Sequence, residues 1–162
     1  MLMVTLFLRY CACSNKLSYM FRKLTDDVLV APQISVDTVT AAAAEGVTLI
    51  VNNRPEDESA DQTPGPEIEA AAQELGLDYI AIPVTHAGFA EWQVTAMADA
   101  LEGTNGKILA YCRSGTRSTL LWALARASKG DHPAVLAEKA ADAGYDLTPI
   151  TAMMDMVRGR AS

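Results

Sequence analysis

The sequence has few of the residues that bind polyanions, build disulfide frameworks or hold metals. Its 162 residues include 13 Lys or Arg against 20 Asp or Glu, which gives a net charge of −7. Nucleic acids and anionic membranes are bound by basic surfaces, so we expect neither as a partner. Three cysteines are too few for a disulfide framework. Two isolated histidines, His86 and His132, cannot build a zinc site, and we expect no metal and no cofactor.

The chain also lacks a long apolar run. Met1–Leu8 is apolar but far shorter than the roughly 20 residues that cross a bilayer, and no basic residues precede it as they do in a signal peptide. Without an export signal we expect a cytoplasmic protein, in which a free thiol stays reduced. Residues 1–19, which include Cys11 and Cys13, differ from the rest of the chain. We expect them to be an upstream extension, with Met20 as the true start and residues 20–162 forming one domain.

The composition is that of a folded α/β domain. Half of the residues are hydrophobic and 20% are charged, which excludes a disordered chain. Short apolar runs predict strands at Phe21–Leu24, Val28–Ala31, Val47–Val51, Tyr79–Val84 and Lys107–Cys112. Helix signals predict a helix capped by Ser35 and running to Ala44, others at Pro66–Leu75, Ala90–Leu101 and Thr119–Ala127, and two more after Asp131 and near Thr148–Pro149. The alternation predicts three layers, with a mainly parallel central sheet and helices on both faces.

In such sheets, ligands bind beyond the carboxyl ends of the strands. Three of the predicted strands end at polar or reactive residues. Arg54 follows the strand Val47–Val51, His86 follows Tyr79–Val84, and Cys112 ends the strand that precedes the apolar helix. These three positions are therefore the first candidates for a functional site.

The segment Tyr111–Ser118, with the sequence YCRSGTRS, is the most informative. A loop of small residues before a helix leaves backbone N–H groups without partners, and with the helix dipole these favour an anion. Arg117 has the planar fork that holds two oxygens of a tetrahedral anion, and Ser118 offers a hydroxyl to the sulfur or to a leaving group. The same positive field stabilises the thiolate form of Cys112. The expected anion-binding residues of the loop are Arg113, Ser114, Gly115 and Thr116.

Two other interpretations of Cys112 stand beside this one. A cysteine at the end of a buried strand is usually an inert core residue, but the Gly, Arg and Ser residues that follow favour a nucleophile in an anion-binding loop. The loop would also suit a sensor that binds phosphate or sulfate without turning it over. A pure binder, however, has no need of a thiol between Tyr111 and Arg113.

YCRSGTRS resembles the active loop of rhodanese sulfurtransferases and, with one more residue, that of protein tyrosine and dual-specificity phosphatases. More of the chain is similar to the phosphatase-like domain of bacterial beta-lactamase hydrolase-like proteins. The similar segments are FRKLTDDVLVAPQIS, IVNNRP, LGLDYIAIPVT and LAYCRSGTRSTLLWALA. The resemblance implies a phosphatase-like α/β fold, with Cys112 as nucleophile and Arg117 as anion ligand. Some members of this family are catalogued as sulfur transferases, so the resemblance leaves the reaction open.

The sequence departs from the tyrosine phosphatase pattern in two ways. Four residues separate Cys112 from Arg117, where those phosphatases carry five and rhodaneses carry four. Dual-specificity phosphatases usually place an Asp general acid after a strand similar to YIAIPV, whereas this chain has Thr85 and His86 there. Imidazole side chains in general titrate near neutral pH, so His86 is the candidate acid, and the alternative is that it is a solvent-exposed loop residue. Further acid candidates lie on nearby segments: Glu56, Asp57, Glu58 and Glu91.

We expect a cysteine-dependent, phosphatase-like hydrolase that acts on a small anionic, phosphate-type substrate through a covalent Cys112 intermediate. The close alternative is a rhodanese-like sulfurtransferase that carries a Cys112 persulfide and needs no general acid. Arg54 is expected either to contact the anion or to pair with the acidic run Glu56–Glu58, with the first interpretation favoured by its place after a buried strand. The sequence leaves the oligomeric state open.

Overall fold

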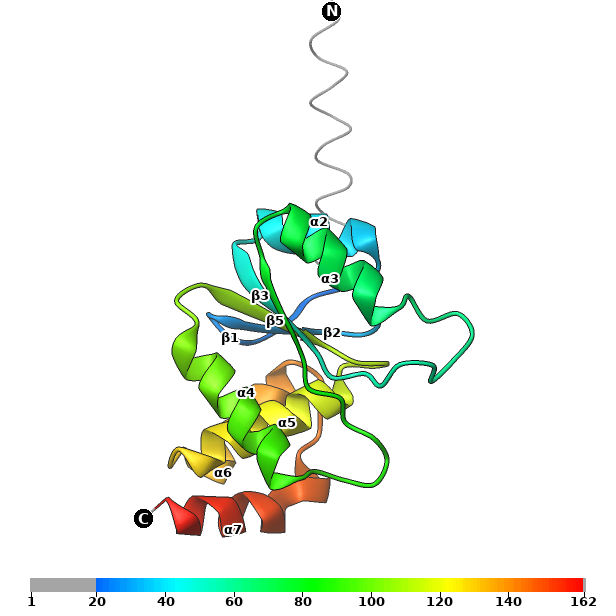
Figure 1. Ribbon diagram of the computed structural model, residues 1–162. Helices are drawn as coiled ribbons and strands as arrows, with labels where there is room; N and C mark the ends of the chain where they lie inside the picture. Colours follow the sequence, from blue (N-terminus) through cyan, green and yellow to red (C-terminus); the bar gives the residue numbers. More distant parts are fainter. Residues whose placement is uncertain (1–19, 162) are drawn as a thin grey trace, which may run out of the picture.

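The computed structural model describes residues 20–161. Strands and helices alternate along most of the chain, as the hydrophobic pattern predicts (Figure 1). The strands are β1 (Arg22–Thr25), β2 (Val28–Ala31), β3 (Val47–Asn52), β4 (Asp78–Ala81) and β5 (Lys107–Tyr111). The helices are α2 (Val36–Ala44), α3 (Gly65–Glu74), α4 (Glu91–Gly103), α5 (Thr116–Ser128), α6 (Pro133–Asp142), the short 3-10 helix η1 (Thr148–Ile150) and α7 (Thr151–Arg160).

The five strands form one sheet in the order β1-β2-β5-β3-β4. β1 and β2 make an antiparallel hairpin, and every other pairing is parallel. β5, although last in the chain, lies in the middle between β2 and β3. The strand that leads into Cys112 is therefore covered on both edges, which explains why its sequence is almost entirely apolar.

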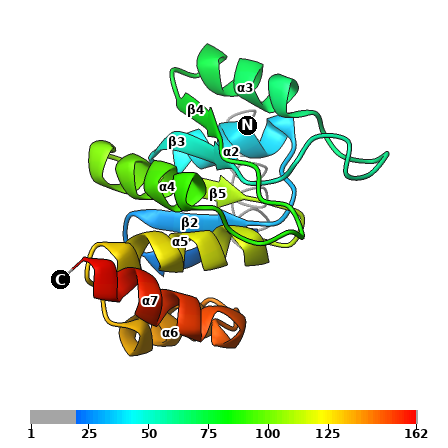
Figure 2. The ribbon, with the colours of Figure 1, turned by 60° about the horizontal axis from the view of Figure 1, so that its bottom comes forward.

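Helices cover both faces of the sheet, so the predicted three-layer architecture is confirmed. α2 and α3 lie on one face, and α4 and α5 lie on the other, with α6 and α7 outside α5 (Figures 1 and 2). Successive strand residues point to opposite faces: Ile108 and Ala110 of β5 belong to the larger core beneath α4 and α5, whereas Leu109 belongs to the smaller core beneath α2 and α3.

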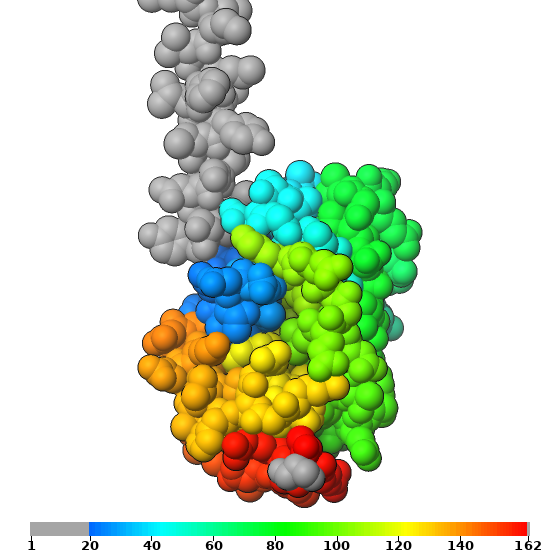
Figure 3. All heavy atoms as spheres, turned by 90° about the vertical axis from the view of Figure 1, so that its left-hand side faces the viewer, coloured from blue at the N-terminus to red at the C-terminus, as the bar shows by residue number. Residues whose placement is uncertain are grey.

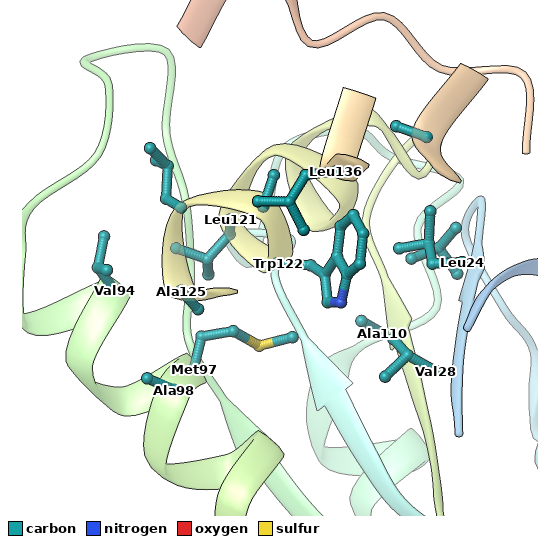
Figure 4. Close-up of a cluster of buried hydrophobic side chains, with 14 of the residues drawn as sticks. Leu24, Val28, Val94, Met97, Ala98, Ala110, Leu121, Trp122, Ala125 and Leu136 are labelled. Carbon is teal, nitrogen blue, oxygen red and sulfur yellow. The ribbon is translucent and has the colours of Figure 1, made fainter. Parts of the chain in front are cut away.

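α5 is the most buried helix of the structure. Leu121, Trp122 and Leu124 are at most 1% exposed, and Figure 4 shows Trp122 packed between Leu136 of α6 and the sheet residues Val28 and Ala110. Removing a large side chain from such a site costs about 3–5 kcal/mol. The N-terminus of α5, which follows the loop that contains Cys112, is thus held by a well-packed helix body.

Most predicted boundaries agree with the structure, and Ser35 caps α2 as expected by accepting a hydrogen bond from the Thr38 N–H group. Two predicted boundaries were wrong, the end of β4 and the start of α5. β4 stops at Ala81 rather than Val84, although the Ile82 and Val84 N–H groups still donate to the Asn52 and Asn53 carbonyls at 2.8 and 3.0 Å. α5 begins at Thr116 rather than Thr119, because Gly115 with φ +88° starts the helix immediately after the loop.

The proposed upstream extension, including Cys11 and Cys13, lies outside the described residues. Within residues 20–161, no helix is both long and apolar enough to cross a membrane. Over the same range, no three His, Cys, Asp or Glu side chains gather closely enough to hold a metal ion.

Candidate active site

Three strand ends meet at the edge of the sheet where the chemistry was expected. Tyr111 of β5 is paired with Ala31 of β2 and with Asn52 of β3, and Asn52 is paired with Ala81 of β4. The segments that follow these strands therefore start side by side. Two backbone hydrogen bonds continue the contact, from the Asn53 N–H group to the Tyr111 carbonyl (2.8 Å) and from the Ile82 N–H group to the Asn52 carbonyl (2.8 Å).

Cys112 lies at the bottom of the loop that joins β5 to α5. Its side chain is fully buried, and its N–H group donates to the Ala31 carbonyl at 3.4 Å. Its sulfur accepts a hydrogen bond from the Gly115 N–H group, with 3.1 Å between nitrogen and Sγ. A backbone donor directed at sulfur is the feature that stabilises a thiolate.

The loop presents further backbone donors around the sulfur. Among the described residues, no hydrogen-bond acceptor engages four of its N–H groups, those of Arg113, Ser114, Arg117 and Ser118. Arg117 and Ser118 belong to the first turn of α5, whose N–H groups have no intrahelical partners and whose dipole adds positive potential. This arrangement is suited to an anion in front of Cys112.

The expected site residues differ in exposure. Arg113, Ser114 and Thr116 are exposed, whereas Gly115 is buried. The Ser114 hydroxyl donates to Thr116 Oγ1 at 3.0 Å, so these two side chains engage each other. Ser118 is fully buried, and its Oγ has no hydrogen-bond partner within residues 20–161. A buried hydroxyl without a partner at the base of this loop is available to a ligand or to the sulfur.

Arg117 is held by a carboxylate that follows β3. Its Nη1 and Nη2 atoms donate to the two oxygens of Glu58 at 2.6 and 2.7 Å, and Nη1 also donates to the Val84 carbonyl at 2.6 Å. The two hydrogen bonds with Arg117 lower the pKa of Glu58 to about 2. The ion pair with Glu58 raises the pKa of Arg117, and negative charge on Cys112 raises it further. Arg117 therefore stays charged within reach of the sulfur.

Arg54 makes a different set of contacts from those favoured by the sequence. Its guanidinium donates to Glu58 (3.2 Å), to Gln33 Oε1 (2.9 Å) and to Ser59 Oγ (2.9 Å), and only 4% of its side chain is exposed. Every nitrogen of the group is thus engaged by protein. Of the two interpretations offered above, pairing with the acidic run is the one that the geometry shows.

His86 lies in the segment between β4 and α4 and is exposed. It does not contact Cys112 through any hydrogen bond among the described residues. It stands two residues after Val84, whose carbonyl binds Arg117, so its segment is attached to the site even though its side chain reaches into solvent. His132 caps α6 by accepting from the Ala134 N–H group at 3.2 Å.

Two of the four acidic side chains considered as proton donors are occupied elsewhere. Glu56 accepts the Gly65 N–H group with both carboxylate oxygens at 3.0 Å and so binds the N-terminus of α3. Glu58 is committed to the two arginines, and Asp57 and Glu91 are exposed. The sequence could not show that Glu58 pairs with Arg117 and that Glu56 binds the start of a helix, because the run contains three adjacent acids.

A hollow of about 250 Å³ lies away from these residues, between the start of α4 and α7. It is lined mainly by apolar side chains, among them Phe89, Val94, Met153 and Val157. Of the residues considered for the site, only Glu91, one of the further acid candidates, lines it. The candidate site is therefore the loop before α5, and one of its neighbours, Tyr145, was not singled out by the sequence.

The parallel sheet with a cysteine loop at the start of a central buried helix defines a phosphatase-like α/β domain. A family model described as the phosphatase-like domain of beta-lactamase hydrolase-like proteins matches residues 20–129. The chain belongs to this family.

Individual relatives agree with the family match. A beta-lactamase hydrolase-like protein from Xylella fastidiosa is 31% identical over 107 residues, which cover 66% of this chain and 25% of the relative. The chain thus spans about a quarter of the length of the curated relatives that it matches.

Solved structures give the same fold. The crystal structure of a candidate phosphatase from Neisseria meningitidis is 28% identical with a TM-score of 0.74, covering 85% of this chain and 97% of that one. Kinase-associated phosphatase, solved with its catalytic-site cysteine replaced by serine, is 14% identical with a TM-score of 0.69, covering 88% and 94% of the two chains. The predicted tyrosine and dual-specificity phosphatase-like fold is confirmed.

Proposed function

We propose that the chain is a cysteine-dependent, phosphatase-like hydrolase that acts on a small phosphate-type anion. The observation that carries this proposal is the hydrogen bond from the Gly115 N–H group to Cys112 Sγ, at 3.1 Å. In the same loop, no acceptor among the described residues engages the N–H groups of Arg113, Ser114, Arg117 and Ser118. The family to which the chain belongs and the phosphatases that share its fold support the same reaction class.

In this reaction the Cys112 thiolate attacks phosphorus, so that an S–P bond forms as the bond to the leaving oxygen breaks. The free N–H groups and Arg117 receive the charge of the transferred phosphoryl group. Arg117 binds Glu58 through Nη1 and Nη2, which leaves Nε and the neighbouring Nη2 proton for two phosphate oxygens. Water then attacks phosphorus, the S–P bond breaks, and inorganic phosphate and the thiolate are released.

The leaving oxygen needs a proton, and we assign the donor to His86. Glu58, with a pKa of about 2 caused mainly by its hydrogen bonds with Arg117, is ionised at neutral pH and has no proton to give. Glu56 is bound at the start of α3. His86 is close in sequence to the Val84 carbonyl that binds Arg117, and a positioned acid contributes roughly 10²–10⁴-fold to such a step.

A second function, sulfur transfer, is favoured by the loop length. Only four residues separate Cys112 from Arg117, and the Gly115 N–H group already contacts Sγ. The thiolate would attack the sulfane sulfur of thiosulfate, forming a Cys112 persulfide and releasing sulfite. Cyanide or a thiol would then take the outer sulfur and restore the thiolate. No general acid is required, which agrees with the exposed position of His86.

One preparation decides between the two reactions. Phosphate release from an aryl phosphate and thiocyanate formation from thiosulfate and cyanide are measured on the wild-type chain and on Cys112→Ser. We expect phosphate release that is lost in Cys112→Ser. Thiocyanate formation without phosphate release would overturn the hydrolase in favour of the sulfurtransferase. Binding of phosphate with neither activity would leave the sensor interpretation and reject both reactions.

A further inference from the structure

Tyr145, in the segment between α6 and η1, touches the active loop from outside. Its hydroxyl donates to the Ser114 carbonyl with 3.1 Å between the oxygens. Behind the ring stands Arg22 of β1, whose guanidinium carbon lies 5.6 Å from the ring centroid and whose Nη1 donates to the Ala143 carbonyl at 3.0 Å. Figure 3 shows this neighbourhood, with the blue residues of the β1–β2 hairpin directly beside the orange segment that includes Tyr145. The phenol is therefore fixed on one side and engaged with the loop on the other.

The carbonyl that Tyr145 binds belongs to the peptide group that serves the nucleophile. The Ser114 C=O and the Gly115 N–H are the two ends of one planar peptide unit and point in opposite directions. The Tyr145 hydroxyl holds the oxygen end, and Cys112 Sγ accepts from the nitrogen end at 3.1 Å. Rotation of this peptide would break both hydrogen bonds together.

We propose that Tyr145 is a positioning residue that keeps the Ser114–Gly115 peptide turned with its N–H group toward Cys112, and thereby stabilises the thiolate. The proposal rests on Cys112 being the reactive thiol, which the hydrolase and the sulfurtransferase share. Tyr145 lies beyond residues 20–129, which the family model matches. The family match therefore assigns it nothing.

The conformation of Gly115 supports this link. Its φ is +88°, a left-handed value that glycine adopts without strain. A Cβ added there would overlap the Tyr145 hydroxyl and would approach the Ala31 carbonyl oxygen to 3.4 Å. The glycine is thus needed both for its backbone angle and for the close approach of the phenol to the peptide.

The charges around the sulfur fit the same arrangement. Burial is the main cause that raises the pKa of Tyr145, and the negative charge of Cys112 adds to it while Arg22 opposes it. The phenol therefore keeps its proton at neutral pH and remains a donor. Arg117, with Glu58 behind it, is the charged group that faces Cys112 from α5. Arg22 stands behind the Tyr145 ring on the β1 side.

The test is the pH dependence of iodoacetamide alkylation at Cys112, followed by mass spectrometry on the Cys112 peptide of the full chain. Tyr145→Phe keeps the ring against Arg22 and removes only the hydroxyl. We expect its alkylation midpoint to rise by about half a pH unit to one unit, which slows the reaction near neutral pH about three- to tenfold. The free energy of unfolding is measured alongside, so that a general loosening of the fold is recognised.

Tyr79→Phe is the matched control. The Tyr79 hydroxyl accepts a hydrogen bond from Asn52 Nδ2 at 2.9 Å, and among the described residues no hydrogen bond joins it to residues 112–115. Its loss should leave the midpoint unchanged. A second variant, Arg22→Met, leaves the phenol in place but removes its support, and we expect a smaller shift in the same direction.

The outcomes separate the two proposals. A depressed wild-type midpoint that is unchanged in folded Tyr145→Phe would overturn the positioning role and leave the proposed function intact. A wild-type midpoint at or above the free-cysteine value of about 8.5 would overturn the reactive thiol, and with it both proposals. An equal shift in Tyr79→Phe would also reject the specific role of Tyr145.

Discussion

Glu58 and Arg117 form a bidentate ion pair between segments that lie 59 residues apart in the sequence. The distances between the paired atoms are 2.6 and 2.7 Å, and at most 18% of either side chain is exposed. The same carboxylate receives Arg54, which is itself almost completely buried. One acid therefore connects the loop after β3 with the first turn of the helix that follows the cysteine loop.

The first prediction concerns the charge of this acid. Glu58→Gln keeps the shape of the side chain but leaves two largely buried guanidinium groups without their counter-ion, and we expect a loss of about 2–3 kcal/mol in the free energy of unfolding. Arg117 becomes less well fixed, so kcat should fall about tenfold. Inorganic phosphate should inhibit at lower concentration, because the competing carboxylate has gone. Urea unfolding, steady-state kinetics and product inhibition measure the three effects.

Glu102→Gln is the matched control for this variant. Glu102 pairs with Lys129 at 3.1 Å on the surface, where both side chains are about half exposed. Exposed pairs of this kind contribute about 0–1 kcal/mol, so stability and kinetics should stay near those of the wild type. Equal losses in the two variants would contradict a special role for Glu58.

The second prediction concerns the stability of the fold at acidic pH. Hydrogen bonding to Arg117 lowers the pKa of Glu58 from its ordinary value of 4.5 to about 2. Because the folded state binds this proton less readily than the unfolded state, the pair stabilises the fold fully above pH 4.5. That stability, about 2 kcal/mol after allowance for solvent screening, is lost as the pH falls toward 2.

Urea titrations of the wild type and Glu58→Gln at pH 7, 4 and 2.5 measure the difference directly. The difference in the free energy of unfolding between the two proteins should be constant above pH 5 and should become smaller as the pH falls below 5. A difference that grows in acid would show that the Glu58–Arg117 ion pair does not cause the difference in stability.

Local sequence features were enough to locate the cysteine loop but not the side chains that support it. The apolar strand, the small residues and the apolar helix around Cys112 are all within twenty residues, and the structure puts them where the pattern predicts. The partner of Arg117 lies 59 residues away in a run of three adjacent acids, and only the packing of the loop after β3 chooses Glu58. Tyr145 gives no local signal at all, because it reaches Ser114 through the turn after α6.

Arg54 is a second residue whose side-chain partners could not be predicted from the sequence. Its position after a buried strand favoured an anion ligand, and that rule correctly located the edge of the sheet at which the candidate residues gather. It could not foresee that Gln33, Ser59 and Glu58 would together occupy the guanidinium. Side-chain partners that come from three separate segments are set by tertiary packing, which a one-dimensional pattern does not contain.

The third prediction concerns Gly115. Gly115→Ala forces a Cβ against the Tyr145 hydroxyl at a left-handed φ of +88°, so we expect a loss of about 2–3 kcal/mol in stability and at least tenfold in kcat. Gly130→Ala is the control, because φ there is +105° and nothing lies within 4 Å of the added atom. It should lose about 1 kcal/mol and no activity. Similar kinetics for the two variants would contradict the importance of the loop geometry.

The last prediction concerns Ser118, whose buried hydroxyl has no partner among the described residues. Removing an unpaired buried hydroxyl breaks no hydrogen bond. The free energy of unfolding of Ser118→Ala should therefore stay within about 0.5 kcal/mol of the wild-type value or rise slightly above it. If the hydroxyl serves the sulfur or the leaving group, kcat should nevertheless fall about tenfold. Ser128→Ala, at the other end of α5, removes a hydroxyl that donates to the Ala125 carbonyl at 2.7 Å. It should show the reverse, with a loss of about 1 kcal/mol and unchanged turnover. Wild-type turnover in Ser118→Ala would remove this residue from the reaction and leave the thiolate to the backbone donors and Arg117.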